Sequence, residues 1–81
     1  MDFNEIMLQL NDLFINLFED ESIVLNAATT SADIDAWDSL NHIHMITAIE
    51  KKYGIRFELE ELLNFSDVGD LCRGIQDKLK D

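Results

Sequence analysis

Residues 34–54 read IDAWDSLNHIHMITAIEKKYG, and this stretch decides the fold. From Ser39 onward its apolar side chains recur at intervals of three and four residues, which is the spacing of one face of an α-helix. Gly54 follows the last of them and can take the left-handed backbone conformation that ends many helices. We therefore predict a helix from about Ser39 to Tyr53. Its apolar face would consist of Leu40, Ile43, Ile46, Ile49 and Tyr53.

Other parts of the chain repeat this helical spacing. Residues 3–18 carry an apolar stripe, and Asp2, with Glu5 three residues on, can cap its start. Residues 68–80 carry a second stripe, and the leucines at 59–63 suffice for one or two helical turns. Strand patterns are missing. The sequence therefore predicts an all-α fold, a small four-helix bundle with three main helices and one short helix.

A long connection of residues 19–38 separates the first two predicted helices. Loops longer than about 12 to 15 residues are uncommon unless they are functional or disordered. Several apolar side chains indicate that this loop is held against the core. They are Ile23, Val24, Leu25 and Ile34.

The composition limits the partners. The chain has 81 residues, 17 Asp and Glu against 6 Lys and Arg, and a formal net charge of −11. This length predicts one domain covering residues 1–81. Nucleic acid phosphates and anionic lipids are bound through Lys and Arg, so the acidity argues against both and favours partners with basic surfaces.

Cellular location follows from what the sequence lacks. Cys72 is the single cysteine, so there is no internal disulfide, and its place on the last apolar stripe predicts a buried, inert thiol. No apolar run approaches the roughly 18 residues of a membrane-spanning helix, and the first residues lack the basic start of a signal peptide. We expect a monomeric, cytoplasmic protein that does not act on membranes.

Residues of a hydrolase triad lie close together in the sequence, namely Asp35, Asp38, Ser39 and His42. Nucleophilic catalysis also needs an oxyanion hole and a pocket, but the Gly-x-Ser-x-Gly turn is missing and so small a bundle rarely encloses a substrate pocket. We predict no catalytic residue and expect that the chain is not an enzyme.

Metal binding is not predicted either. Asp33, Asp35 and Asp38 begin like a calcium loop, but Asp38 stands where an EF-hand needs glycine, and His44 where it needs glutamate. His42 and His44 are two residues apart on a predicted helix, so their side chains diverge by about 200 degrees and cannot hold one ion together.

The start of the second predicted helix has two interpretations. Asp38 and Ser39 are residue types that cap helix N-termini, which is the simpler one. A serine at a helix N-terminus after a long loop would also expose its hydroxyl beside unpaired amides that can receive a phosphate. Because no base stands beside Ser39, another enzyme would have to activate it.

At these residues the chain resembles the acyl carrier protein family, including the related peptidyl carrier domains. The resemblance covers essentially the whole chain. It consists of the long first loop, Asp38-Ser39-Leu40 at the opening of the second helix, the helix end near Tyr53-Gly54, the short third helix, and FSDVGDL at residues 65–71.

The resemblance implies that a phosphopantetheinyl transferase attaches 4′-phosphopantetheine from coenzyme A covalently to Ser39. The thiol of this arm would carry an acyl group as a thioester between enzymes, which raises its effective concentration at each of them. Ketosynthases, acyltransferases and adenylate-forming ligases are the implied partners. Asp38 would cap the helix or help to position a metal-bound phosphate, and Leu40 would contact a partner or pack into the bundle. Further partner-facing candidates are Asn41, His42, Ile43 and His44.

The second helix departs from the pattern of fatty acid carriers, which present acidic residues to basic enzyme surfaces. Asn41, His44, Glu50 and Lys51 stand at the corresponding positions, and only Glu50 keeps the charge. Loss of complementary charges slows association and changes partner choice. Trp37 before the motif also resembles carriers of specialised pathways, such as polyketide, nonribosomal peptide or surface-sugar acylation systems, so we expect such a pathway rather than general fatty acid synthesis.

Two alternatives remain at this stage. The chain could be a peptidyl or aminoacyl carrier that is loaded by a different ligase, or an unmodified acidic helical adaptor for basic partners. If it carries acyl chains, a longer one could lie between the helices in a cavity lined by Ile43, Ile46, Leu62 and Ile75.

Overall fold

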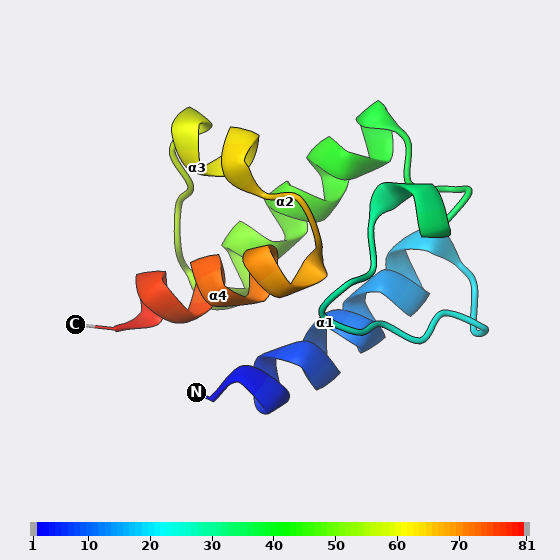
Figure 1. Ribbon diagram of the computed structural model, residues 1–81, viewed down its shortest axis with the longest axis horizontal. Coiled ribbons are helices and arrows are strands. Elements are labelled where there is room, and N and C mark those ends of the chain that lie inside the picture. Colours follow the sequence, from blue (N-terminus) through cyan, green and yellow to red (C-terminus); the bar gives the residue numbers. More distant parts are fainter. Residues whose placement is uncertain (1, 81) are drawn as a thin grey trace.

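The computed structural model describes residues 2–80, which form four α-helices (Figure 1). They are α1 (Phe3–Phe18), α2 (Ser39–Tyr53), α3 (Leu59–Asn64) and α4 (Val68–Leu79). A 3-10 turn, η1 (Ser31–Asp33), lies in the long connection between α1 and α2 and has no counterpart in the sequence-based prediction. Residues 2–80 contain no strand, and the predicted all-α, four-helix fold is confirmed.

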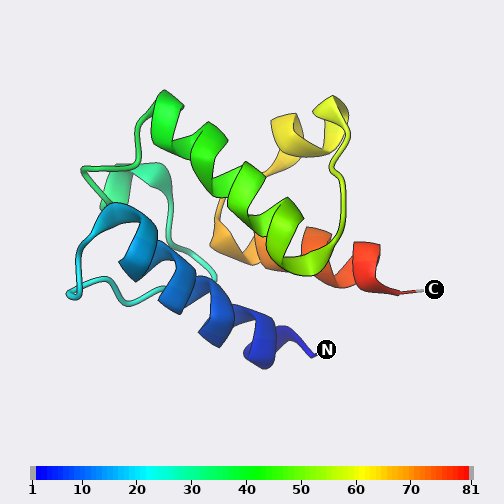
Figure 2. The same ribbon diagram turned by 180° about the vertical axis from the view of Figure 1, so that it is seen from behind.

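The helices form a small bundle around α1. α1 runs from the end of the molecule that holds both termini to the far end, and α2 and α4 run back in the opposite sense (Figures 1 and 2). α1 contacts both of these helices, and the short α3 stands between the end of α2 and the start of α4 along the chain. The start of α2 therefore lies at the end remote from the termini. Within residues 2–80, no helix is long and apolar enough to cross a membrane.

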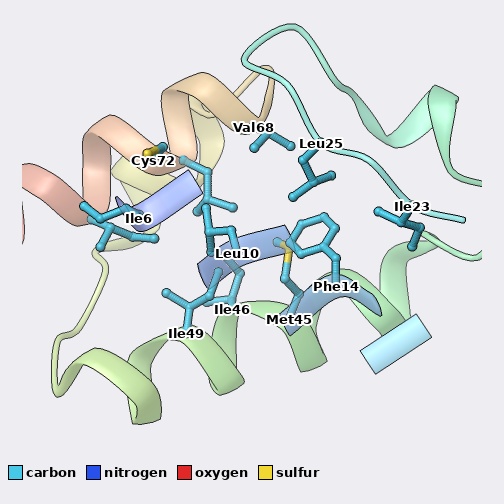
Figure 3. Close-up of a cluster of buried hydrophobic side chains, with 12 residues drawn as sticks. Ile6, Leu10, Phe14, Ile23, Leu25, Met45, Ile46, Ile49, Val68 and Cys72 are labelled. Carbon is cyan, nitrogen blue, oxygen red and sulfur yellow. The ribbon is translucent and has the colours of Figure 1, made fainter. Parts of the chain in front are cut away.

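The core is a single cluster of buried hydrophobic side chains that point toward one another from α1, α2, α4 and the long loop (Figure 3). α3 has no fully buried residue, so it covers the bundle without entering its centre. The cluster consists of Ile6, Leu10, Phe14, Ile23, Leu25, Met45, Ile46, Ile49, Val68, Leu71, Cys72 and Ile75.

Part of the predicted apolar face of α2 lies outside this core. Leu40 and Ile43 are 65% and 62% exposed, whereas Met45, which the predicted face omitted, is fully buried. The first turns of α2 extend beyond α4 in Figure 1, which agrees with the exposure of these two side chains. The second half of this face is thus buried in the core, whereas Leu40 and Ile43 stay exposed, as residues expected to face a partner would be.

The long loop is held to α1 by the side chain of Asn11. Its Oδ1 accepts a hydrogen bond from the backbone N–H of Leu25 at 2.6 Å, and its Nδ2 donates to the carbonyl of Ile23 at 3.3 Å. Ile23 and Leu25 are buried, but Val24 between them is 81% exposed because consecutive side chains of an extended segment point to opposite sides. The loop is pinned to the core as predicted, and the prediction that Val24 takes part is wrong.

The same loop caps α4. The backbone N–H groups of Val68 and Gly69 donate to the carbonyls of Thr29 and Ala27, both at 2.9 Å, which satisfies two amides that a helix start leaves unpaired. A Cβ atom at position 69 would lie 2.9 Å from the carbonyl oxygen of Ala27. Glycine is therefore required at this crossing, and the loop and α4 are fixed to each other.

α1 ends in a strained conformation. Glu19 has φ 54° and ψ 43°, the left-handed region, which costs a residue with a Cβ atom about 1 kcal/mol. Its carboxylate also lies at the helix C-terminus, where the dipole disfavours negative charge.

Replacing Glu19 with glycine should therefore raise the free energy of unfolding by about 1 kcal/mol. Chemical denaturation monitored by circular dichroism measures this change. Glu21→Gly is the matched control, since it removes the same charge at a position whose φ is not positive and should stabilise less or destabilise. If both variants were stabilised equally, loss of negative charge would explain the result, and the proposed backbone strain at Glu19 would be contradicted.

Charge pairing is sparse. Within residues 2–80 the ion pairs are Arg73 with Asp70 at 2.8 Å and Lys78 with Glu61 at 2.7 Å, the latter joining α4 to α3. The hydrogen bonds from these cations lower the pKa of Asp70 and of Glu61. Most of the 17 acidic side chains are therefore left to repel one another.

Added salt should relieve this repulsion and raise the melting temperature. The Debye length falls from about 30 Å at 0.01 M to about 8 Å at 0.15 M ionic strength, so most of the gain should appear over that range. Thermal denaturation in increasing NaCl, with sucrose as the uncharged control, measures it. A melting temperature that does not change with NaCl would show that the repulsion is negligible.

Candidate functional site

The start of α2 presents a serine on a capped helix. Asp38 has an extended backbone, and its Oδ1 accepts a hydrogen bond from the N–H of Asn41 at 2.8 Å, so Asp38 caps α2 as predicted. Ser39 is the first helical residue and is exposed. Among residues 2–80, no hydrogen bond holds its hydroxyl or its backbone N–H. A reactive group approaching from solvent can therefore reach this oxygen.

The backbone before Ser39 is fixed by a set of short-range hydrogen bonds. The carbonyl of Ala36 accepts from the N–H of Asp38 at 3.0 Å and from Nδ2 of Asn41 at 2.7 Å. One residue earlier, the N–H of Trp37 donates to the carbonyl of Ile34 at 3.0 Å. The exposed serine thus follows a rigid segment, residues 34–38, which we call the entrance of α2.

Trp37 anchors this entrance to α1 and to α2. Its indole lies edge-on to Phe14, with ring centroids 5.2 Å apart at 90°, and also contacts Phe18 at 6.5 Å. Its Nε1 donates to Nδ1 of His42 at 3.0 Å, and the two rings are tilted by only 14°. One side chain therefore joins both helices next to Ser39.

Sequence reasoning missed this contact, although a signal for it was present. Relative to the cap residue Asp38, Trp37 is the preceding residue and His42 is the fourth helical residue, and these two positions commonly pack against each other as a hydrophobic staple. The hydrogen bond between the rings depends on side-chain rotamers, which the sequence pattern does not specify.

The residues of the apparent triad are not arranged as a triad in the structure. Nδ1 of His42 accepts a hydrogen bond from Nε1 of Trp37, so this nitrogen is engaged and does not face the Ser39 hydroxyl as a base. The carboxylate of Asp38 is engaged with the backbone of α2. Asp35 is exposed and, among residues 2–80, its side chain makes no hydrogen bond. This entrance has no base oriented by an acid toward Ser39, which a triad requires.

Two hollows lie near the start of α2, and Ser39 lines the first of them. A surface hollow of about 420 Å³ is lined by Ser31, Trp37, Asp38, Ser39 and His42. A smaller, partly open hollow of about 80 Å³ is lined by Ser31, Trp37, His42, Met45, Phe65, Ser66, Asp67 and Leu71. None of these residues belongs to the predicted lining by Ile43, Ile46, Leu62 and Ile75. Of that set, Ile46 and Ile75 are buried in the core and Ile43 is exposed.

The predicted partner-facing residues divide into two groups. Leu40, Ile43 and His44 are exposed on α2. Asn41 and His42 are half-buried, and both side chains are hydrogen-bonded within the entrance. The first group is available to a partner, whereas the second holds the serine in place.

The remaining candidate residues form no site of their own. Among the residues that the structure describes, no group of three or more His, Cys, Asp or Glu side chains could hold a metal ion. Cys72 is fully buried, and its Sγ donates to the carbonyl of Phe3 at 3.4 Å. Burial raises the pKa of this thiol to about 11, so it stays protonated at neutral pH, in agreement with the predicted inert thiol.

Comparisons with known proteins show what the chain is similar to. Residues 25–75 match the family model described as phosphopantetheine attachment site. The chain is also similar to the solution structure of holo acyl carrier protein from Geobacter metallireducens, with 44% sequence identity, a TM-score of 0.87, and coverage of 90% of this chain and 84% of that chain. A search of curated proteins gives no match.

The entrance fits a phosphodiester-linked group. Ser39 supplies an exposed hydroxyl, and the backbone N–H groups of Ser39 and Leu40 lie in the first turn of a 15-residue helix, where amides favour a phosphate. The surface hollow beside Ser39 leaves room for a flexible arm.

Removing the cap should loosen the entrance. We expect Asp38→Ala to lower the free energy of unfolding by about 1 kcal/mol, because the N–H of Asn41 loses its acceptor, and Asp38→Asn to retain most of the stability. Chemical denaturation tests both variants. Asp35→Ala is the control and should change stability by less than about 0.5 kcal/mol. A loss from Asp35→Ala as large as that from Asp38→Ala would mean that charge, not capping, is responsible.

Proposed function

Since the chain belongs to the acyl carrier protein family, whose members hold 4′-phosphopantetheine covalently, we propose that Ser39 is the residue that carries this group. The proposal rests on the exposed hydroxyl of Ser39 on the capped first turn of α2, inside the segment that matches the family model. The group supplies a flexible arm that ends in a thiol, which holds an acyl group as a thioester.

Attachment requires that the Ser39 oxygen lose its proton and form a bond to phosphorus, while the bond from that phosphorus to the nucleotide part of coenzyme A breaks. Nδ1 of His42 is engaged by the indole of Trp37, and Oδ1 of Asp38 caps α2, so neither group is oriented as a base toward the Ser39 hydroxyl. In this proposal, a group of the phosphopantetheinyl transferase takes the proton. This chain contributes the nucleophilic oxygen and holds its position.

The same geometry supports a role as a substrate shuttle rather than a catalyst. A fixed serine with no oriented base can hold a tethered intermediate but has no means to transform it. Tethering raises the effective concentration of the intermediate at each partner enzyme.

The face of α2 supports a specialised set of acyl-processing partners. Exposed Leu40 and Ile43 are available for apolar contact, and the exposed His44 lies between them and the C-terminal half of the helix. Glu50, the acid that α2 shares with fatty acid carriers, accepts a hydrogen bond from the N–H of Phe57 at 2.9 Å and is half-buried. Its charge is thus turned toward this chain, which leaves α2 with little acidic surface for a basic partner.

Intact mass spectrometry after incubation with coenzyme A and a broad-specificity phosphopantetheinyl transferase tests the attachment. The wild-type protein should gain the mass of one arm, and Ser39→Ala should gain none. Ser31→Ala is the matched control, because Ser31 is an exposed serine that lines the same hollow, and it should be modified like the wild type. An unmodified wild type, or an arm that persists in Ser39→Ala, would contradict the proposal.

Loading of the modified protein separates an acyl carrier from an aminoacyl carrier. The holo protein is offered in parallel to adenylate-forming ligases for fatty acids and for amino acids. We expect a fatty acyl thioester. Loading by amino acid ligases alone would assign the chain to the peptidyl carriers, and the acyl assignment would be wrong.

A further inference from the structure

One face of α2 stays exposed from the first turn of the helix to the last. The side chains on this face recur at intervals of three and four residues, so they lie on the same side of the helix. They are Leu40, Ile43, Thr47 and Lys51, and all are exposed. The face is therefore apolar beside the attachment serine, uncharged in its middle, and positively charged at its end.

The cation at the end of this face has two neighbours of the same charge. Lys52 follows it in the last turn of α2, and Arg56 lies in the segment between α2 and α3. All three side chains are exposed, and none of them makes an ion pair within residues 2–80. We call Lys51, Lys52 and Arg56 the basic patch.

Contacts within the chain account for only part of this patch. Lys51 and Lys52 lie where the helix dipole favours positive charge, but Arg56 follows the end of the helix and has no such role. Glu50 precedes Lys51 in the sequence, but its carboxylate accepts a hydrogen bond from the N–H of Phe57 at 2.9 Å. The positive charge is thus open to a contact outside this chain.

The basic patch is separated from the most acidic part of the molecule. Residues 1–38 contain nine acidic residues and no Lys or Arg. α1 ends and α2 begins at the end of the molecule remote from the termini, and α2 carries its last turn back toward them (Figure 1). At 1.5 Å per residue, Lys51 lies about 18 Å from Ser39 along the helix axis. The exposed acids that follow α1 or precede α2 are Glu19, Asp20, Glu21, Asp33, Asp35 and Asp38.

We propose that the basic patch docks on an acidic surface of the adenylate-forming ligase that loads this carrier. The proposal rests on the proposed attachment at Ser39, which places the start of α2 at the opening that receives the arm. The acidic surface then lies about 18 Å from that opening, with Leu40 and Ile43 in apolar contact nearer to it. If α2 lay in the opposite direction, the acidic residues of the long loop would face this surface and repel it, so the patch fixes the orientation of docking.

Reversal of single charges tests the docking with the ligase that loads the holo protein. Lys51→Glu and Arg56→Glu should each lower kcat/KM about threefold at low ionic strength, because a charge at the rim of an interface acts mainly on association. Added NaCl should remove most of this difference. Lys80→Glu is the matched control, because it changes the net charge by the same amount at an exposed position after α4, and it should load like the wild type.

The opposite sign of the effect is equally informative. If Lys51→Glu and Arg56→Glu load as fast as Lys80→Glu, or faster than the wild type, the ligase has no acidic surface at this place and the proposal is overturned. Circular dichroism checks that each variant is folded. Arg56→Glu keeps the test decisive if Lys51→Glu destabilises α2, because Arg56 lies outside the helices.

The charge of the patch is measured separately on the unmodified protein. A nitroxide probe that carries a carboxylate and one that carries an ammonium group are compared by the paramagnetic broadening of amide resonances. The anionic probe should broaden the amides of Lys52 and Arg56 more than the cationic probe does, and the order should reverse at Asp20 and Asp35. Stronger broadening by the cationic probe at the patch would show that the net charge outweighs the three cations, and it would overturn the inference. An unmodified wild type in the intact-mass experiment would instead defeat the attachment at Ser39, so the two failures are distinguished.

Discussion

The architecture around Ser39 depends on where one indole ring is held. Trp37 packs edge-on to Phe14 in the core of α1 and donates to His42 on α2, so the end of the long loop cannot move without breaking contacts with both helices. Edge-to-face aromatic pairs contribute about 0.5 to 1.5 kcal/mol beyond their buried area, which is substantial in a domain of this size. Contacts that Trp37 makes inside the protein thereby fix the position of Ser39, which is exposed on the surface.

The rest of the loop enlarges the hydrophobic core of a small domain. So small a domain buries only about 60% of the surface of its unfolded chain, and this one has no disulfide among its described residues to compensate. The loop supplies Ile23 and Leu25 to the core and gives two carbonyls to the start of α4. The loop therefore acts as a structural element that joins α1 to α4. Its last residues lead directly into α2.

The sequence was sufficient to predict those features that depend only on residues close to one another along the chain. Apolar spacing located α1, α2 and α4, and Asp38 and Gly54 marked the two ends of α2. Spacing identifies which residues share a face, but not whether another element covers that face, so it did not decide between core and surface for Leu40 and Ile43. Likewise, η1 and the hydrogen bonds to Asn11 arise from the path of the loop over the bundle, and no local pattern encodes that path.

The candidate site shows the same division between local and tertiary information. The position of Ser39 followed from Asp38-Ser39-Leu40 at the opening of a helix, because capping is a local property. The smaller hollow near it is lined by Trp37, His42, Met45 and Phe65 among others, which come together only after α2 and the segment before α4 have packed. A carrier needs an attachment point that enzymes can reach and a cargo that water reaches as little as possible. A rigid exposed serine meets the first of these requirements, because the hydrogen bonds before and after it hold its backbone in place while its hydroxyl stays open to solvent.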